Sequence, residues 1–346
     1  MTVRSISIKD VARRAGVSPT TVSRVLNNSA HPVNSKTRRR VKAAIAELNF
    51  HPNRLAQGLI NNKSHLIGVI VHDLSDPYFA EMVKGMERVI IKYDYIVNIY
   101  NTSRDVDKEL KAVDLLRANR AEAVVLTGGT LLDQHYREEM AGYIKELQSN
   151  GSIVLGVTAH PFNIKSIELG NSLAARLITN YLLEQGHRAI AYINGPAILG
   201  TTNERWQGFQ EALLARKIPI RDKWIVAGDF SFEGGRRAAR QLLDEITGLT
   251  AVVASNDEMA LGVMWEFKNQ GLAIPDDLSV VGIGNIPAAK YAYPPLTTIA
   301  LPIFDLGVQI GEYLINTLGD KGSFNDQPEV QLSLVERDSV RSLLEV

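Results

Sequence analysis

The stretch SIKDVARRAGVSPTTVSRVLNN, residues 7–28, decides how the first part of this chain folds. Its first apolar residues recur at i, i+3, i+4 and i+7, the spacing of a short amphipathic helix: Ile8, Val11, Ala12 and Ala15. Gly16 ends this helix. Ser18 followed by Pro19 begins a second one, because serine is a good N-cap and proline suits the first helical turn. A helix, a tight glycine turn and a second helix make a helix-turn-helix unit.

A third helix, expected at about residues 35–48, supports this unit, which lies in a strongly basic segment. Residues 1–63 contain 12 Lys and Arg against two acids, Asp10 and Glu47, so the segment has a charge of +10. The whole chain has 38 basic and 38 acidic residues, which leaves −10 on the remainder. A net charge of zero therefore hides a basic module for a polyanion, joined to an acidic body with a different task.

The second helix is the part of such a unit that reads DNA, because its N-terminal end enters the major groove. Arg24 can read guanine through two hydrogen bonds, Thr20 can offer a methyl or hydroxyl group, and Ser18 suits a phosphate. The expected DNA contacts of the head are Ser18, Pro19, Thr20, Thr21, Ser23, Arg24 and Asn27. The alternative is that these polar residues only cap helices and form a solvated face.

The head resembles that of the lactose/galactose-repressor family of bacterial transcription factors. The resemblance rests on D-V-A-x-x-A-G-V-S-x-x-T-V-S-R-V-L-N, which begins at Asp10, and on T-R-x-x-V, A-x-x-E-L-N and P-N-x-x-A further along. This run is far more specific than a helix-turn-helix pattern alone. It implies a DNA-binding transcriptional regulator whose helix-turn-helix domain spans residues 1–52.

Residues 53–63 join the head to the body. Ala56, Leu59 and Ile60 share one face of a possible two-turn helix, which is too short to be stable alone in water. The resemblance implies a hinge helix that pairs with its twin in a dimer and enters the minor groove, where Leu59 wedges between base pairs. The DNA contacts that it implies here are Asn53, Arg54, Gln57 and Leu59. The alternative is a flexible linker with an incidental leucine.

From residue 66 the pattern changes to apolar strands that alternate with amphipathic helices. LIGVIVHDL at 66–74 and AVVASND at 251–257 are typical of buried strands and their ends, and NSLAARLITNYLLEQG at 171–186 is typical of a helix. This alternation predicts parallel sheets covered on both faces. The number of strands suits two similar α/β lobes, with ligands at the C-terminal ends of the strands.

Composition and missing motifs argue against several classes of function. The 45% hydrophobic and 22% charged residues fit a soluble globular protein, and no apolar run is long enough for a membrane helix. The N-terminus lacks the apolar core of a signal peptide, and the chain has no cysteine, so we expect a cytoplasmic protein. No G-x-G-x-x-G follows a strand, and no Walker A run, nucleophile elbow or metal-ligand spacing occurs. We therefore expect no cofactor, no metal and no enzymatic activity.

The body resembles the effector domain of the same family, which has the periplasmic-binding-protein fold. Matching runs include EQGHRAIAYINGP at 184–196, ASNDEMALGVMWEF at 254–267 and PPLTTIALPIFDLG at 294–307. The resemblance implies an effector-binding and dimerisation domain over residues 64–346, with crossovers near Leu169, Ala300 and Val330. Lobe 1 would span about 64–168 and 301–329, and lobe 2 about 169–300 and 330–346. A symmetric dimer on an approximately palindromic operator is expected.

The resemblance also implies which residues line the cleft between the lobes: Asp73, Tyr78, Phe79, Thr127, Gly156, Arg205, Phe230, Asn256, Glu258 and Gly284. Phe79 and Phe230 suit apolar or stacking walls, Arg205 can hold a carboxylate, a phosphate or paired hydroxyls, and Asn256 offers a donor and an acceptor. The alternatives are that Tyr78 and Phe79 belong to the core of a lobe and that Arg205 only pairs with Asp229.

Two positions depart from the pattern of sugar-binding family members. Many of those carry a carboxylate where this chain has Gly156, and an aspartate where it has Gly284. Their absence argues against a neutral sugar, and Arg205 favours an anionic one, such as a sugar phosphate or sugar acid. The sequence thus predicts a transcriptional regulator, expected to be a repressor, that is controlled by a small molecule in the cleft. The alternatives are control by a partner protein, as in catabolite-control regulators, and a solute-binding protein.

Overall fold

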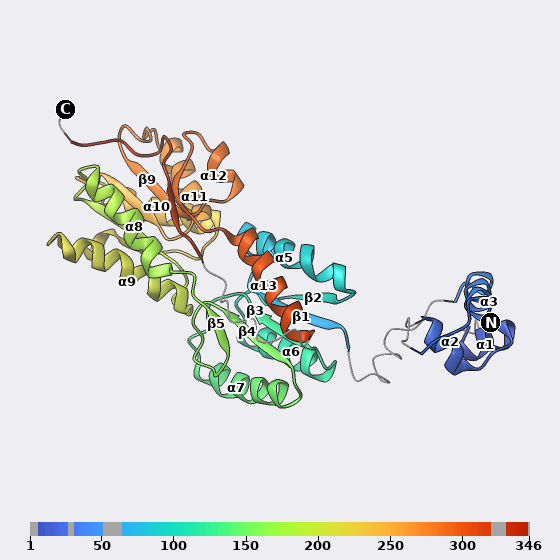
Figure 1. Cartoon of the computed structure of the whole chain (residues 1–346). Helices are drawn as coiled ribbons and strands as arrows, with labels where there is room; N and C mark the ends of the chain where they lie inside the picture. Colours follow the sequence, from blue (N-terminus) through green and yellow to red (C-terminus); the bar gives the residue numbers. More distant parts are fainter. Residues whose placement is uncertain (1–5, 27–30, 51–63, 320–329, 345–346) are drawn as a thin grey trace, which may run out of the picture. The chain divides into compact units, whose positions relative to one another are not determined.

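The computed structural model describes residues 6–26, 31–50, 64–319 and 330–344. The chain divides into two compact units, Met1–Ser64 and His65–Val346. The first unit is the basic head, and the second is the larger α/β body (Figure 1). Within the described ranges, no helix combines the length and apolar character needed to cross a membrane.

The head is a three-helix unit built as its sequence pattern predicts. Its helices are α1 (Ile8–Ala15), α2 (Pro19–Leu26) and α3 (Ser35–Glu47). Gly16 adopts a left-handed conformation with φ 61° and ends α1, which allows the tight turn into α2. Buried Val11, Val22 and Val41, one from each helix, form the centre of the small core. The predicted helix-turn-helix is confirmed.

Some of the basic residues of the head hold its helices together. Arg14 of α1 forms an ion pair of 2.7 Å with Glu47 at the end of α3. Arg40 of α3 donates a hydrogen bond of 2.5 Å to the carbonyl oxygen of Ala15 at the end of α1. A cation next to the carboxyl end of a helix is favourable because the last carbonyl groups lack partners within the helix. These two arginines therefore stabilise the head.

Lobe 1 of the body contains a five-stranded parallel sheet in the order β2-β1-β3-β4-β5. Its strands are β1 (Leu66–Val71), β2 (Ile96–Asn101), β3 (Ala123–Leu126), β4 (Ile153–Val157) and β5 (Lys165–Ile167). Its helices are α5 (Pro77–Ile90), η1 (Ile91–Tyr93), α6 (Val106–Ala118), α7 (Gln134–Ser149) and α13 (Ile303–Leu318). Helix α13 comes from late in the chain and packs closely on α5, because Gly85 and Gly307 have no side chain between the two backbones.

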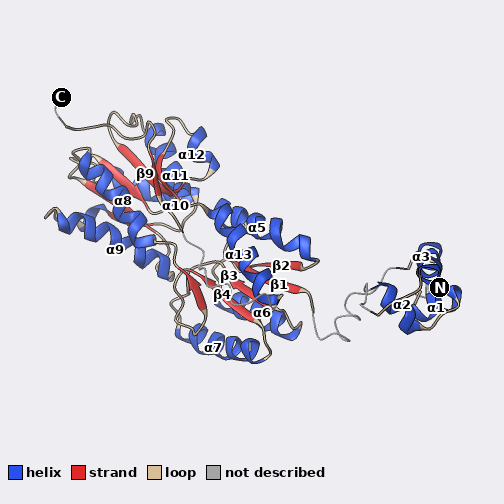
Figure 2. Ribbon diagram, in the orientation of Figure 1, coloured by secondary structure: helices blue, strands red, loops and turns tan. Residues whose placement is uncertain are grey.

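Lobe 2 contains a six-stranded sheet in the order β11-β10-β9-β8-β6-β7, in which only β11 is antiparallel to its neighbour. Its strands are β6 (Ile190–Asn194), β7 (Ile225–Ala227), β8 (Ala251–Ala254), β9 (Ser279–Gly284), β10 (Thr297–Ala300) and β11 (Ser333–Val335). Its helices are α8 (Asn171–Glu184), α9 (Gly200–Ala215), η2 (Asp222–Trp224), α10 (Phe232–Leu243), α11 (Asp257–Asn269) and α12 (Pro287–Tyr291). Helices flank both sheets (Figure 2).

The chain passes between the lobes three times. It leaves lobe 1 after β5 and enters lobe 2 at α8, returns after β10 to α13, and adds β11 to the sheet of lobe 2. An antiparallel bridge between Leu131 and Leu199 also joins the lobes, with a hydrogen bond of 2.7 Å from the Leu132 amide to the Ile198 carbonyl. The predicted two-lobed α/β fold is confirmed, and the carboxyl ends of both sets of strands face the space between the lobes.

Candidate functional site

Helix α2 presents its predicted DNA contacts on the surface while its apolar side is buried. Val22 and Val25 lie in the core of the head, and Ser18, Pro19, Thr20 and Arg24 are exposed. Ser18 begins the helix as an N-cap: its hydroxyl oxygen accepts a hydrogen bond of 3.2 Å from the Thr21 amide. Thr21 and Ser23 are half-buried. The other predicted DNA contacts lie outside the described residues: Asn27, Asn53, Arg54, Gln57 and Leu59.

A cavity lies between the two lobes of the body, and most of the predicted cleft residues line it. These are Tyr78, Phe79, Thr127, Arg205, Phe230, Asn256, Glu258 and Gly284. Asp73 is not in the lining; its carboxylate accepts hydrogen bonds of 3.0 and 2.6 Å from the amide and hydroxyl of Ser75. Gly156 does not line the cavity either, and a Cβ atom built on it would lie 2.6 Å from Cδ2 of His160.

Arg205 of α9 is the central cation of the cavity. Its side chain is 6% exposed, and its Nε donates a hydrogen bond of 3.0 Å to Oδ1 of Asn171. A second nitrogen donates to the carbonyl oxygen of Ser255. Burial lowers the pKa of the guanidinium from its ordinary value. Among the described residues Arg205 forms no ion pair, and Asp229 pairs with Arg237 instead, so the pairing of Arg205 with Asp229 is not formed.

Aromatic rings form part of the cavity wall. Tyr78 and Phe79, on the first turn of α5, contact each other edge to face with ring centroids 4.9 Å apart. Phe230, in the loop between β7 and α10, lies 5.8 Å from the Arg205 guanidinium. Asn256 holds this loop: its amide nitrogen donates to the Phe230 carbonyl at 2.9 Å, while its oxygen accepts from the Met259 amide at 3.1 Å. Asn256 therefore positions Phe230 and caps α11, and both ends of its amide are occupied.

Three lining residues adopt the left-handed backbone conformation without being glycine. They are Arg104 with φ 60°, Thr158 with φ 84° and Phe230 with φ 68°. Such conformations cost free energy and persist where the surrounding structure holds them, commonly at ligand sites. Arg104 and Thr158 were not among the residues predicted from the sequence. Thr158 directly follows β4, so the rule that ligands bind at the carboxyl ends of strands was the available signal.

Three carboxyl groups complete the lining. Asp76 caps α5 by accepting a hydrogen bond of 2.9 Å from the Tyr78 amide, and burial raises its pKa. Asp257 accepts bonds of 2.6 Å from the Thr298 hydroxyl and 2.9 Å from the Ile286 amide, and burial raises its pKa to about 6. Burial, with the nearby charges of Asp76 and Asp257, also raises the pKa of Glu258. A Cβ atom on Gly284 would lie 3.3 Å from Oδ2 of Asp257, so this carboxylate stands beside the missing side chain.

A buried polar network supports the lobe 1 wall. His72, which lines the cavity, lies with its Nε2 3.3 Å from Oε2 of Glu109. The hydroxyl of Tyr136 donates a hydrogen bond of 2.7 Å to the other carboxylate oxygen of Glu109. Burial acts to raise the pKa of Glu109, but its hydrogen bonds with His72 and Tyr136 outweigh this and hold the pKa below its ordinary value. In the described part of the chain, no group of three or more metal-ligating side chains occurs.

Comparison with known proteins agrees with both units. Residues 7–53 match the family model described as "Bacterial regulatory proteins, lacI family", and residues 179–340 match "Periplasmic binding protein-like domain". The chain is 34% identical over 337 residues to the HTH-type transcriptional repressor CytR of Escherichia coli (strain K12), covering 97% of each. It is 31% identical to the catabolite control protein A of Priestia megaterium, covering 88% of this chain and 90% of that one.

A solved structure of the lac repressor dimer, bound to operator and an anti-inducer, superposes with a TM-score of 0.85 at 30% identity. The match covers 98% of this chain and 100% of that one. These similarities span both the head and the body. The chain therefore belongs to the lacI family of bacterial regulatory proteins and is a DNA-binding transcriptional regulator.

Proposed function

We propose that this protein represses transcription by binding an approximately palindromic operator as a homodimer. The exposed polar residues of α2 and the +10 charge of residues 1–63 support a major-groove contact with nearby phosphate contacts. The lac repressor is a dimer on its operator, and two copies related by a two-fold axis read two inverted half-sites. Such a protein acts where the bacterial chromosome is, in the cytoplasm.

A small polar molecule in the cavity between the lobes would control operator affinity. The observation that carries this proposal is a set of buried polar atoms in the lining that have no hydrogen-bond partner within the protein: Nε of Arg104 and Oγ1 of Thr158. Buried polar atoms are nearly always paired, because an unpaired one loses its bonds to water. The left-handed conformations of the same two residues agree with a site shaped for a ligand rather than for stability.

The chemistry of the lining favours a sugar-derived ligand that carries an anionic group. Phe79 and Phe230 offer apolar surface for a ring, as small-molecule sites commonly do. Arg205 is buried without a carboxylate partner in the described residues, and a guanidinium binds a phosphate or carboxylate more strongly than a neutral hydroxyl. We assign effector contacts to Tyr78, Phe79, Thr127, Arg205, Phe230 and Glu258.

A ligand that touches both lobes would favour one arrangement of them over another. Operator affinity then changes to the extent that the ligand binds the two arrangements with different affinity. Catabolite control protein A is nearly as similar to this chain as CytR is, so a partner protein as the signal is the second candidate. It becomes the preferred one if no small molecule binds the cavity.

A thermal-shift panel of neutral sugars, sugar phosphates and sugar acids tests the effector proposal. We expect an anionic sugar to raise the unfolding midpoint of the wild type and to lose this effect in Arg205→Ala. Arg216→Ala is the matched control, since Arg216 is an exposed arginine of lobe 2 outside the lining. A neutral sugar that stabilises wild type and Arg205→Ala equally would refute the anionic effector.

A further inference from the structure

Arg104 enters the cavity from lobe 1, in the loop between β2 and α6. Ser103 and Arg104 both adopt the left-handed conformation, with φ of 55° and 60°. This costs free energy for residues other than glycine, and an arginine offers no compensating local hydrogen bond of the kind that asparagine or aspartate makes. The strained loop directs the Arg104 side chain into the cavity lining, where its Nε is buried without a partner.

Arg104 and Arg205 approach the same aromatic ring from different lobes. The Arg104 guanidinium carbon lies 5.9 Å from the centroid of the Phe230 ring, and that of Arg205 lies 5.8 Å from it. The two guanidinium groups are therefore at most about 12 Å apart, the sum of these distances. Neither forms an ion pair with any described residue, although both are in the lining of one cavity.

Asp76 is the carboxylate that lies near both arginines. All three side chains line the same cavity. Burial raises the pKa of Asp76, whereas the hydrogen bond from the Tyr78 amide and the charges of Arg104 and Arg205 act in the opposite direction. The Asp76 carboxylate is held at the start of α5 by the Tyr78 amide and makes no ion pair of 4 Å or less with a described residue. It therefore lowers the local positive potential without satisfying the hydrogen-bond donors of either guanidinium.

We propose that Arg104 and Arg205 together hold one anionic group of the effector, so that Arg104 is the determinant of ligand specificity in lobe 1. The inference rests on the proposed effector site and adds a second cation to it. An anion held by one arginine from each lobe binds best when the lobes are close, because charge-assisted hydrogen bonds require short donor–acceptor distances. The ligand thereby favours the closed arrangement.

Titration calorimetry at constant ionic strength tests this with inorganic phosphate, ribose 5-phosphate, gluconate and neutral ribose as probes. Arg104→Asn removes the cation but suits the left-handed backbone, since asparagine adopts it readily. We expect this variant to weaken binding of the phosphate probes about tenfold or more, as for a lost hydrogen bond to a charged group. Arg104→Lys should retain part of the affinity, because it keeps the charge without the planar fork.

Arg120→Asn is the matched control, because Arg120 is also a left-handed arginine of lobe 1, with φ 53°, but is outside the lining. Asp76→Asn should have the opposite effect to Arg104→Asn: it preserves an N-cap while removing a negative charge near both arginines, so anion affinity should rise several-fold. Asp133→Asn is its control, since Asp133 caps α7 through the Tyr136 amide away from the cavity lining.

The outcomes separate this inference from the proposed function. The inference is supported if Arg104→Asn weakens binding of the phosphate probes and Asp76→Asn strengthens it, while the two control variants leave it unchanged. If Arg205→Ala abolishes binding of the phosphate probes while Arg104→Asn leaves it unchanged, the effector site stands and the role of Arg104 is refuted. If only ribose binds, or if gluconate and the phosphates bind the wild type no better than ribose, both the anionic effector and the role of Arg104 are refuted.

Discussion

The ring of His160 occupies the space that a side chain on Gly156 would need. A Cβ atom built on Gly156 would lie 2.6 Å from Cδ2 of His160 and 3.1 Å from the hydroxyl oxygen of Ser166. Gly156, where the family resemblance led us to expect a carboxylate, therefore has its side-chain space filled by His160. His160 stacks on Phe162 with centroids 6.0 Å apart, and burial lowers its pKa to about 4, so the ring is neutral near pH 7.

This packing predicts a strong coupling between the two positions. Gly156→Ala should lower the free energy of unfolding by about 1–3 kcal/mol, because overfilling a packed region forces its neighbours to move. In the double variant with His160→Ala the methyl group has room, so most of this loss should be recovered. Urea unfolding of the two single variants and the double variant measures the coupling. Additive losses would show that the two residues do not compete for the same space.

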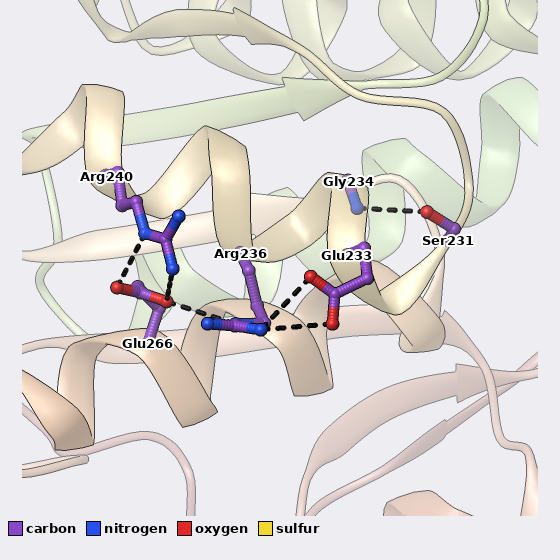
Figure 3. Close-up of polar contacts among 6 residues, drawn as sticks. All are labelled: Ser231, Glu233, Gly234, Arg236, Arg240 and Glu266. Atoms are coloured by element: carbon purple, nitrogen blue, oxygen red, sulfur yellow. Dashed lines mark hydrogen bonds and ion pairs between the residues drawn. The ribbon is translucent and has the colours of Figure 1, made fainter.

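Glu266 and Glu233 both pair with Arg236, but we expect their replacement to change the stability of the protein by different amounts. Glu266 of α11 is 2% exposed and accepts hydrogen bonds from Arg240 at 2.8 Å and Arg236 at 3.1 Å (Figure 3). Arg236 also pairs with Glu233, whose side chain is 61% exposed. Glu266→Gln should lower the urea midpoint clearly and Glu233→Gln only slightly, because a surface ion pair contributes little whereas a buried one leaves unpaired charges when broken.

The same contacts make the contribution of Glu266 to the stability of the protein depend on pH. Its hydrogen bonds from Arg240 and Arg236 lower its pKa to about 2. The stabilisation is therefore complete above the ordinary pKa of about 4.3 and is lost as the pH falls toward 2. The difference in urea midpoint between wild type and Glu266→Gln should shrink on acidification over this range. A constant difference would mean that the carboxylate charge contributes nothing.

The buried His187 should destabilise the protein on acidification at a less acidic pH than Glu266 does. It is fully buried, with Nδ1 3.0 Å from the Thr250 hydroxyl oxygen and Nε2 3.1 Å from the Arg341 carbonyl oxygen, and burial lowers its pKa to about 4. Between about pH 6.5 and pH 4 the unfolded chain binds a proton here that the folded chain does not. The free energy of unfolding should fall across this window as the pH decreases, by about 3 kcal/mol at most.

The measurement for His187 is urea unfolding at pH 7.5, 6, 5 and 4.5. His187→Gln should be less stable than wild type near neutral pH and should show a flatter decline on acidification. His135→Gln, which replaces an exposed histidine of α7, is the control and should follow the wild type. Equal slopes for wild type and His187→Gln would assign the acid sensitivity to other groups.

The sequence predicts the head and the class of the body because their signals are local. The apolar spacing, the left-handed Gly16 and the Ser18 N-cap all act within a few residues, and buried strands between amphipathic helices identify α/β lobes. Details at the ends of strands are harder to predict. Adjacent side chains there point to opposite faces, so an error of one residue exchanges Asp73 for His72 in the cavity lining.

The remaining misses depend on contacts between distant parts of the chain. Asn256 lines the cavity, but its amide holds the Phe230 loop and the start of α11, which no local pattern reveals. Arg104 reaches the cavity only because two successive left-handed residues turn its loop inward. Neither serine nor arginine is typical of such a conformation, so the sequence gives no signal for it.

Residues of the head and of the linker should differ in what they contribute to DNA binding. Arg24 is exposed on α2, so Arg24→Ala should reduce the ratio of specific to non-specific affinity. Arg54 lies outside the described residues, and as an expected backbone contact its replacement by alanine should weaken all sequences more evenly. Binding to a duplex selected from a randomised library and to an unrelated duplex measures both. Loss of discrimination in Arg54→Ala alone would reverse these assignments.

The salt dependence of binding to the selected duplex tests the central claim most directly, since it requires no knowledge of the effector. Two copies of a segment with a charge of +10 should neutralise several phosphates, and each contributes about −0.9 to the slope of log affinity against log salt. We predict a palindromic site, two protein chains per duplex and a slope steeper than about −4. A salt-insensitive complex, or a library from which no sequence is enriched, would contradict the assignment of this chain as an operator-binding regulator.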